Sequence, residues 1–337
     1  MNSPENQKEV HHRTPGSPGH PVSAVDRDAA VTKWSYDFTV FIPTYNRAYV
    51  LERTLDSVAQ QSYRNLETLI IDDGSTDGTT DLIRSLEKKF DFPIVYHWQR
   101  NQGGHAAHNR AIMVAKGKFF IRLDSNDSLL PDALERVMEH WNLIPEGERD
   151  RFAGIVGLCL KEDGALSGIP YPQDILDADY LQIAGIGNMS GEKREATRTS
   201  VLRKFPYPVI EGENHMRTTM IFWRMALDYR MRFINVPILI SRHAPAGITR
   251  RRFEYRMKNP KGLRLVFLEQ ITLFSSYLGP RKLMRSHIRY IRYSLHSGVG
   301  PIHQSREVKH LIFWFLALPA GTLKWMRDIL RKTVEGF

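Results

Sequence analysis

The sequence contains very little cysteine: Cys159 is the single one among 337 residues. A disulfide within the chain and a metal site built from cysteines alone are therefore excluded. Cys159 stands inside the apolar run 155–160, so we interpret it as a small buried hydrophobic side chain. The count is consistent with a reducing compartment such as the cytosol.

Long hydrophobic runs are also missing. Residues 1–30 are rich in proline, serine, histidine and charge and contain no apolar segment, so we predict no signal peptide. The longest late apolar run covers residues 311–318 and stops at Pro319, where we expect the helix to break. A membrane-spanning helix needs about 20 apolar residues, so this run is too short to cross a bilayer.

Acidic residues are the scarcer charged type, with 37 Asp and Glu against 47 Lys and Arg, which gives a net charge of +10. This excess indicates an anionic partner, which can be a nucleic acid, an acidic membrane surface or a phosphate-bearing substrate, or else a solvated basic surface. The sequence lacks zinc-ligand spacing, a helix-turn-helix pattern and an RNP-like motif. We therefore predict no nucleic-acid partner.

Composition divides the chain into three parts. Residues 1–35 are rich in proline and histidine and have no hydrophobic periodicity, which predicts a disordered tail. Residues 36–249 are expected to form the main domain, with a nucleotide half at 36–150 and an acceptor half at 151–249. The remaining residues, 250–337, predict a basic amphipathic helical region.

Short β-rich runs alternate with segments of helical apolar spacing in the first half of the main domain. The expected strands are 38–42, 66–71, 93–98 and 119–123, and the expected helices are 49–62, 81–86, 106–115 and 131–141. Alternation of this kind predicts an α/β fold with a mostly parallel sheet that helices cover on both faces. In the second half we expect strands at 154–160 and 232–240 and a helix at 218–227.

Polar clusters follow three of the expected strands, at the edge where such sheets bind ligands. The clusters are Thr44-Tyr45-Asn46, Asp72-Asp73 and Asp124-Ser125-Asn126-Asp127. The carboxylates of Asp72 and Asp73 suit a nucleotide base or ribose, although a turn that caps a helix explains them too. The third cluster carries hard oxygen ligands that suit Mg²⁺ or Mn²⁺ with a bound diphosphate; the alternative is a polar loop before the next helix.

Two further carboxylates, Glu211 and Glu213, follow the apolar segment 205–210. A carboxylate that faces a cleft can take the proton of an acceptor hydroxyl as general base. The alternative is an exposed acidic loop.

Basic side chains are interleaved with apolar and aromatic ones in three C-terminal segments, 263–277, 281–293 and 309–330. A helix of this type lies in the interface of an anionic membrane, or else it packs on the core. We favour the membrane and expect a cytoplasmic protein that is peripheral at the inner face of the membrane.

Four motifs stand in a fixed order along the chain. They are residues 41–47 (FIPTYNR), 51–63 (LERTLDSVAQQSY), 70–79 (IIDDGSTDGT) and 115–127 (AKGKFFIRLDSND), and weaker ones follow at 101–109, 191–193, 201–206 and 211–213. Together they resemble the bacterial branch of the family 2 glycosyltransferases, which have a GT-A fold. The resemblance covers residues 36–249.

The resemblance implies an inverting transfer of a hexosyl or N-acetylhexosaminyl group. The donor is a nucleotide-diphosphate sugar, usually UDP-linked, and the acceptor is a hydroxyl of a saccharide or lipid-linked molecule, as in bacterial surface polysaccharide synthesis. The residues implied in donor binding are Pro43, Thr44, Tyr45, Asn46, Asp72, Asp73, Asn101, Asn109, Asp124 and Ser125.

The resemblance also implies a divalent cation, Mg²⁺ or Mn²⁺, held by Asp124, Asn126 and Asp127. Asn126 stands where the family's Asp-x-Asp motif has its second carboxylate, and an amide oxygen still binds a hard cation but lacks the charge. Metal affinity is then lower, or Asp127 takes the role. The implied general base is Glu213, with Glu211 in reserve.

Two other functions are alternatives to this one. Asn126 and Asn214 favour a catalytically degenerate scaffold that binds a nucleotide sugar at the membrane. A nucleotidyltransferase would need a glycine-rich, lysine-bearing loop after the first strand, which residues 43–47 do not provide.

Overall fold

The computed structural model describes residues 34–185, 191–242 and 252–335. Most of the tail expected at 1–35, and the boundary expected between residues 249 and 250, lie outside this part, so both stay predictions. The strands are β1 (Tyr36–Thr44), β2 (Leu66–Asp72), β3 (Ile94–Trp98), β4 (Gly117–Arg122), β5 (Ser128–Leu129), β6 (Phe152–Lys161), β7 (Ile175–Ala178), β8 (Lys193–Arg198) and β9 (Arg230–Ser241).

The helices of the described residues follow the same numbering. They are α1 (Ala48–Ala59), α2 (Thr79–Leu86), α3 (Gly104–Val114), α4 (Ala133–Asn142), α5 (Tyr180–Gly185), α6 (Thr199–Leu202), α7 (Thr219–Met225), α8 (Arg252–Lys258), α9 (Pro260–Thr272), α10 (Pro280–His296), α11 (Pro301–Glu307) and α12 (Leu311–Glu335), with short 3-10 helices η1 (Glu146–Arg151) and η2 (Ser275–Tyr277). Every strand and helix expected in the first half is present, with ends shifted by a few residues.

One mixed sheet organises the fold, with strands in the order β3-β2-β1-β4-β8-β6-β9-β5 and with β7 paired to β9. Strands β1 to β4 pair in parallel, which confirms the prediction for the nucleotide half. Beyond β4 the pairs are antiparallel except for β6 with β9. Because parallel strands end at a common edge, the segments that follow β1, β2 and β4 lie together.

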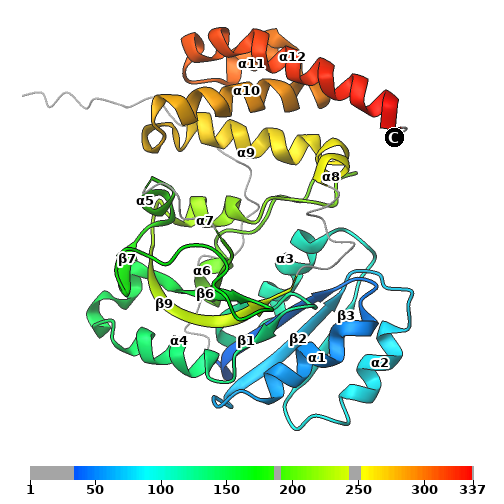
Figure 1. Ribbon diagram of the computed structural model, residues 1–337, viewed down its shortest axis with the longest axis vertical. Coiled ribbons are helices and arrows are strands. Elements are labelled where there is room, and N and C mark those ends of the chain that lie inside the picture. Colours follow the sequence, from blue (N-terminus) through cyan, green and yellow to red (C-terminus); the bar gives the residue numbers. More distant parts are fainter. Residues whose placement is uncertain (1–33, 186–190, 243–251, 336–337) are drawn as a thin grey trace, which may run out of the picture. The chain divides into compact units, whose positions relative to one another are not determined.

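Alternating side chains of the central strands feed two cores. Phe38, Val40 and Ile42 of β1 belong to the core that includes residues of α1, α2 and α4. Phe41, one position out of phase, belongs to the core that includes residues of α3, α6 and α7. Figure 1 shows α1 and α2 on one side of β1 and β2. The sheet is therefore covered on both faces, as predicted.

Strand β8 was not predicted from the sequence. It lies between β4 and β6 and pairs antiparallel with both. Its sequence, KREATR, is mostly charged and lacks an apolar alternation, yet Arg194 and Ala196 are buried. Its position in the sheet comes from its neighbours rather than from its own hydrophobicity.

The C-terminal helices have a core of their own, which includes Phe267 of α9, Tyr290 of α10 and Trp314 of α12. In Figure 1 these helices are drawn from yellow to red. Arg224 of α7 and Glu269 of α9 form an ion pair at 2.5 Å, which ties this region to the acceptor half. In the residues described, no helix is long and apolar enough to cross a membrane.

The break expected at Pro319 is wrong: α12 continues through this residue to Glu335. Proline removes one backbone hydrogen bond and usually kinks a helix. Here Trp314 and Ala317, before Pro319, are buried in the C-terminal core. After it, Asp328 accepts a hydrogen bond from Arg292 of α10. These contacts hold α12 on both sides of Pro319.

Candidate active site

The carboxyl ends of β1 and β2 place Thr44 directly beside Asp72, since these two residues are partners in the strand register. Thr44 is buried, and its Oγ1 atom has no hydrogen-bond partner among the described residues. Tyr45 next to it is half exposed. A buried, unsatisfied hydroxyl at the ligand-binding edge is a group that a ligand can satisfy. Pro43 completes the end of β1.

Asp72 and Asp73 are both buried and use their carboxylates to shape loops. Asp72 accepts hydrogen bonds from the Ser75 N–H at 2.8 Å and the Tyr96 hydroxyl at 2.9 Å. Asp73 accepts bonds from the Gln99 side chain and from the N–H groups of residues 102 and 103, at 2.7 to 2.9 Å. In the described geometry these carboxylates position the binding loops, and direct contact with a base or ribose stays a prediction.

Asn46 and Asn109 also act within the protein. Asn46 has a left-handed backbone, φ 51°, and its Oδ1 accepts the Thr76 N–H at 2.8 Å, so it joins the loops that follow β1 and β2. Asn109 exchanges two hydrogen bonds with the backbone of Tyr207, at 2.8 and 2.9 Å. This pair fixes the segment that leads to Glu211. Asn101 is exposed beside the same loops.

The turn before α3 touches the acceptor half at Gly103. Its φ of 90° suits glycine, and a Cβ atom there would lie 1.8 Å from the Asn214 carbonyl oxygen. No side chain fits this approach. The nucleotide loop held by Asp73 therefore lies against the residue that follows Glu213.

Asp124 is the ionised carboxylate of the third cluster. Its Oδ1 accepts a bond from Arg122 Nε at 2.7 Å, and its Oδ2 lies 3.5 Å from Arg194. Burial favours the neutral acid, but the two guanidinium charges outweigh it and lower the pKa of Asp124 to about 2. The side chain remains 35% exposed, so one face of the carboxylate is open.

Asp127 has the opposite environment. It is buried, and its oxygens face the Arg242 N–H at 2.9 Å and the Arg194 side chain at 3.3 Å. Burial, followed by the charge of Asp124, raises the pKa of Asp127 to about 7. Asn126 donates its amide to the Arg242 carbonyl and to Asp127, at 3.2 Å for the second bond.

A divalent cation fits this cluster through Asp124. Mg²⁺ is bound by one or two carboxylates together with substrate phosphates and water, and Asp124 offers an ionised, partly open carboxylate. Asp127 is turned into the protein, and the buried Ser125 accepts a bond from Thr54 through its carbonyl at 2.8 Å. The described part of the chain has no group of three or more His, Cys, Asp or Glu that could hold a metal.

Glu213 binds the beginning of α9. Its two oxygens accept the N–H groups of Lys261 at 2.6 Å and Gly262 at 2.7 Å. Burial raises the pKa of Glu213, and these two bonds partly oppose that shift. Its role as base stays a prediction, as does that of Glu211, which is exposed.

Sequence reasoning missed three groups that the fold brings to this edge. Arg122 ends β4, Arg194 comes from the unpredicted strand β8, and His215 follows Asn214. Burial and the charges of His105, Arg217 and Arg122 lower the pKa of His215, which places these groups in one electrostatic neighbourhood. The available signal for Arg194 was a pair of basic residues, Lys193 and Arg194, between Glu192 and Glu195.

Two comparisons with known sequences agree with a nucleotide-sugar site at this edge of the sheet. A family model described as Glycosyl transferase family 2 matches residues 39–161. The GalNAc(5)-diNAcBac-PP-undecaprenol beta-1,3-glucosyltransferase of Campylobacter jejuni is 32% identical over 173 residues, which are 49% of this chain and 52% of that protein. Residues 39–161 are thus similar to glycosyltransferase family 2. The chain spans about half the length of the first curated relatives of this family that it matches.

Solved glycosyltransferase structures agree with a GT-A-type fold for this chain. The complex of S. aureus TarS 1–349 with UDP-GlcNAc has a TM-score of 0.54 at 16% identity, covering 86% of this chain and 92% of that one. The mannosyltransferase PcManGT of Pyrobaculum calidifontis, with GDP-Man and Mn²⁺, has a TM-score of 0.50 at 17% identity, covering 88% and 89%. At these identities the likeness concerns the fold alone.

Proposed function

We propose that this protein is an inverting glycosyltransferase that moves a sugar from a UDP-linked donor to a hydroxyl of a lipid-linked saccharide in surface polysaccharide assembly. One observation carries the proposal. Thr44 and Asp72 end β1 and β2, and Asp124 follows β4 at the same edge of the sheet. The Gly103–Asn214 contact brings the Glu213 segment close to the loop that Asp73 holds. Donor and acceptor groups are thereby held together, which favours an in-line reaction.

The donor side consists of an open hydroxyl and a charged platform. Thr44 Oγ1 and Tyr45 line the nucleotide pocket, and Asp72 and Asp73 fix the loops around it. Arg122 supplies positive charge next to Asp124 for the departing diphosphate. A divalent cation bound by Asp124 would neutralise further charge on that leaving group.

Glu213 is the proposed base. Each of its oxygens accepts one N–H bond and retains a second lone pair, so the carboxylate is oriented without being blocked. Glu213 takes the proton of the acceptor hydroxyl, and the oxygen forms a bond to the anomeric carbon. The bond from that carbon to the diphosphate breaks on the opposite face, and UDP leaves with the electron pair. The configuration at the anomeric carbon is thereby inverted.

The lipid-linked nature of the acceptor is supported by α12. Large apolar side chains are exposed along it in a helical stripe: Leu311, Ile312, Phe315, Leu316, Leu323, Met326, Leu330 and Val334. The exposed cations Lys324 and Arg327 lie on the same helix. An apolar stripe with flanking positive charge complements a bilayer that contains anionic lipids. The Campylobacter jejuni relative is named for an undecaprenol-linked substrate.

Transfer assays test the proposal. A panel of UDP-sugars is incubated with Mn²⁺ and polyprenyl-diphosphate saccharides, and UDP release is measured. Asp124→Ala should abolish metal-dependent turnover, Asn126→Asp should preserve or raise it, and Asp163→Ala, which removes a surface carboxylate, should leave it unchanged. Full turnover and Mn²⁺ dependence in Asp124→Ala would remove the donor-site assignment.

The base is tested separately. Glu213→Gln keeps the oxygen that faces one N–H of α9 but cannot accept the proton, so kcat should fall by about 100-fold or more. Glu211→Gln is the matched control and should retain activity. Nucleotide binding without turnover by any donor would instead indicate the degenerate scaffold.

A further inference from the structure

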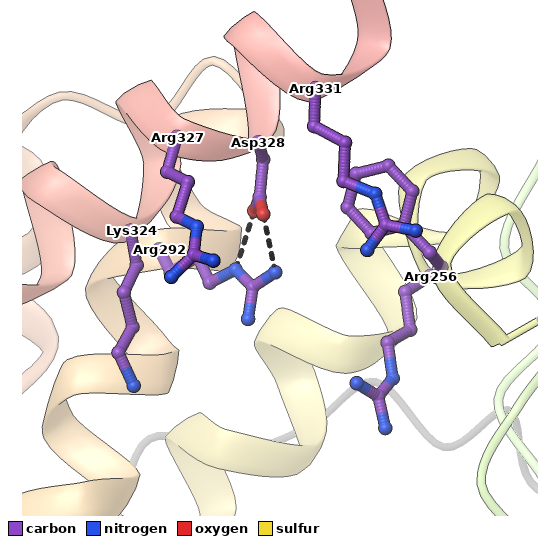
Figure 2. A pocket seen from close by; sticks show the side chains of 7 residues that line it. Arg256, Arg292, Lys324, Arg327, Asp328 and Arg331 are labelled. Atoms are coloured by element: carbon purple, nitrogen blue, oxygen red, sulfur yellow. Dashed lines mark hydrogen bonds and ion pairs between the residues drawn. The ribbon is translucent and has the colours of Figure 1, made fainter. Parts of the chain in front are cut away.

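A cationic pocket of about 480 Å³ lies in the C-terminal helices, away from the proposed donor site. Figure 2 draws the side chains that line it. The lining residues are Phe253 and Arg256 of α8, Arg292 of α10, and Lys324, Arg327, Asp328 and Arg331 of α12. Five of these seven side chains are basic and one is acidic. Such a surplus of one charge selects an anionic ligand.

The single carboxylate does not neutralise this surplus. Asp328 binds Arg292 through both oxygens and also lies 2.9 Å from His296. Figure 2 shows the two Arg292–Asp328 bonds, with Lys324 and Arg327 extending beside them. Within the described residues, Arg256, Lys324 and Arg327 have no carboxylate at ion-pair distance. They form the part of the pocket that is free to bind an anion.

A second pocket of about 460 Å³ shares three of these residues, Arg256, Arg292 and Lys324, and reaches His215. It adds Arg217 and Arg289. Both new guanidinium groups lie over the ring of Phe267, at 6.0 and 5.5 Å from its centroid. The two pockets together form one cationic cleft that leads from α12 toward the Glu213 segment.

Like charges in this cleft oppose one another. Arg217 and Arg289 are exposed through the mouth of the cleft, but the surrounding protein and the charges of nearby arginines lower the pKa of both. Neither has an ion-pair partner among the residues described. An anion that binds between them would relieve the repulsion, and the planar guanidinium matches phosphate oxygens in a two-bond geometry.

We propose that the cationic cleft binds the diphosphate group of a lipid-linked acceptor. This inference rests on the proposed function and names where that substrate's charge is held. A lipid-linked acceptor carries its lipid, diphosphate and sugar in that order, and the surfaces of the protein that fit these three groups follow one another in the same order. The apolar stripe of α12 faces the lipid, Arg256 and Lys324 hold the phosphates, and His215 and Glu213 lie at the end where the sugar hydroxyl arrives.

Direct binding tests the site. Inorganic diphosphate is titrated calorimetrically into the full chain in the absence of divalent cations. Arg256→Ala and Arg289→Ala should each weaken binding by about 10-fold, because each removes a charge-assisted hydrogen bond. Arg281→Ala on the same helix as Arg289 removes an exposed charge outside the cleft and should bind as the unaltered protein does. Equal affinity in all four proteins would overturn the proposal.

Vesicles separate an acceptor from an ordinary phospholipid headgroup. Phosphatidylcholine vesicles are compared with vesicles that also contain phosphatidylglycerol or a polyprenyl diphosphate. The unaltered protein should prefer the polyprenyl diphosphate over phosphatidylglycerol, and Arg256→Ala/Arg289→Ala should lose this preference. If the unaltered protein shows no preference, the cleft holds headgroups and the acceptor assignment falls.

UDP binding distinguishes a failure of the cleft from a failure of the proposed function. The double variant should bind UDP as tightly as the unaltered protein and should raise KM for the acceptor more than it lowers kcat. Diphosphate binding that depends on the cleft, in a protein that transfers no sugar, would leave the site standing and remove the catalytic role. Unchanged acceptor KM in an active double variant would remove the site alone.

Discussion

At the scale of single residues, Arg194 determines the charge of the third cluster. Its guanidinium lies 3.5 Å from Asp124 and 3.3 Å from Asp127, so one cation serves two carboxylates. The carboxylates consequently have different properties: Asp124 is ionised and partly open, whereas Asp127 is buried with a raised pKa. A cation held by Asp124 would compete with Arg194 for the same oxygen.

Arg194→Gln should therefore destabilise the protein and increase the stabilisation that added Mn²⁺ gives. Removing one partner of a buried ion pair costs roughly 3–5 kcal/mol, so the Tm should fall. Added Mn²⁺ should raise the Tm of Arg194→Gln more than that of the unaltered protein, because Asp127 is then left without a counter-charge and Asp124 retains only Arg122. Arg198→Gln, on the same strand with a fully exposed partner, is the control. If Mn²⁺ does not raise the Tm of Arg194→Gln more than that of the unaltered protein, the prediction is wrong.

His108 makes folding sensitive to acid. It is buried between the rings of Phe41, Phe120 and Tyr207, and burial, assisted by Arg122, lowers its pKa from 6.5 to about 3. A depressed histidine pKa means that the unfolded chain binds the proton first. The contribution of His108 to stability is thus fully present above pH 6.5 and is lost as pH falls toward 3, at about 1.4 kcal/mol per pH unit.

His108→Phe keeps an aromatic ring and removes the titrating group. Its acid-unfolding midpoint, followed by circular dichroism, should lie at lower pH than that of the unaltered protein. His140→Phe, at a partly exposed helix position where the His side chain is bound to the backbone of Arg136, should not shift the midpoint. An unchanged midpoint in His108→Phe would show that another group controls acid unfolding.

At the scale of elements, the sequence predicted the helices and strands that have their own apolar pattern. It missed those whose position depends on neighbouring strands, such as β8. The β-rich runs and helical spacings of the nucleotide half identified β1 to β4 because each segment carries its own apolar pattern. Strand β8 has no such pattern, and so Arg194 could not be placed. The positions of Thr44, Asp72 and Asp124 at one edge followed from parallel topology, whereas the capping contact of Glu213 joins residues 48 positions apart and leaves no local signal.

In α12 the sequence predicted a feature that the structure lacks. Pro319 predicted a break in the helix, but the helix continues because its packing holds it. Pro319 is exposed and removes one backbone bond without offering a contact in return. Pro319→Ala should raise the free energy of unfolding by about 1–3 kcal/mol and increase the Tm. Pro301→Ala is the control, because proline at the first turn of α11 sacrifices no helical bond. A lower Tm in Pro319→Ala would mean that α12 requires the bend.

At the scale of the whole molecule, the proposed membrane contact would use both the net charge of +10 and the apolar stripe of α12. Charge attracts the protein to an anionic surface from a distance, and apolar burial retains it there. Flotation with phosphatidylglycerol vesicles should decline as salt rises. Phe315→Ser/Leu323→Ser should reduce flotation at every salt concentration, because it removes about 2 kcal/mol or more of apolar burial.

Leu143→Ser is the control for the stripe, since it changes an exposed leucine on the nucleotide half. Flotation that is equal for the stripe variant and this control would show that α12 does not contact lipid.

The contact of Gly103 with Asn214 limits how this protein can be rebuilt. The loop before α3 and the segment before α9 meet through backbone atoms, so neither can be lengthened or shortened alone without separating them. A chimera that exchanges the acceptor half for that of a relative must therefore exchange both segments as a matched pair. Grafts that cross between them should fold around a displaced Glu213, even when both parents are active.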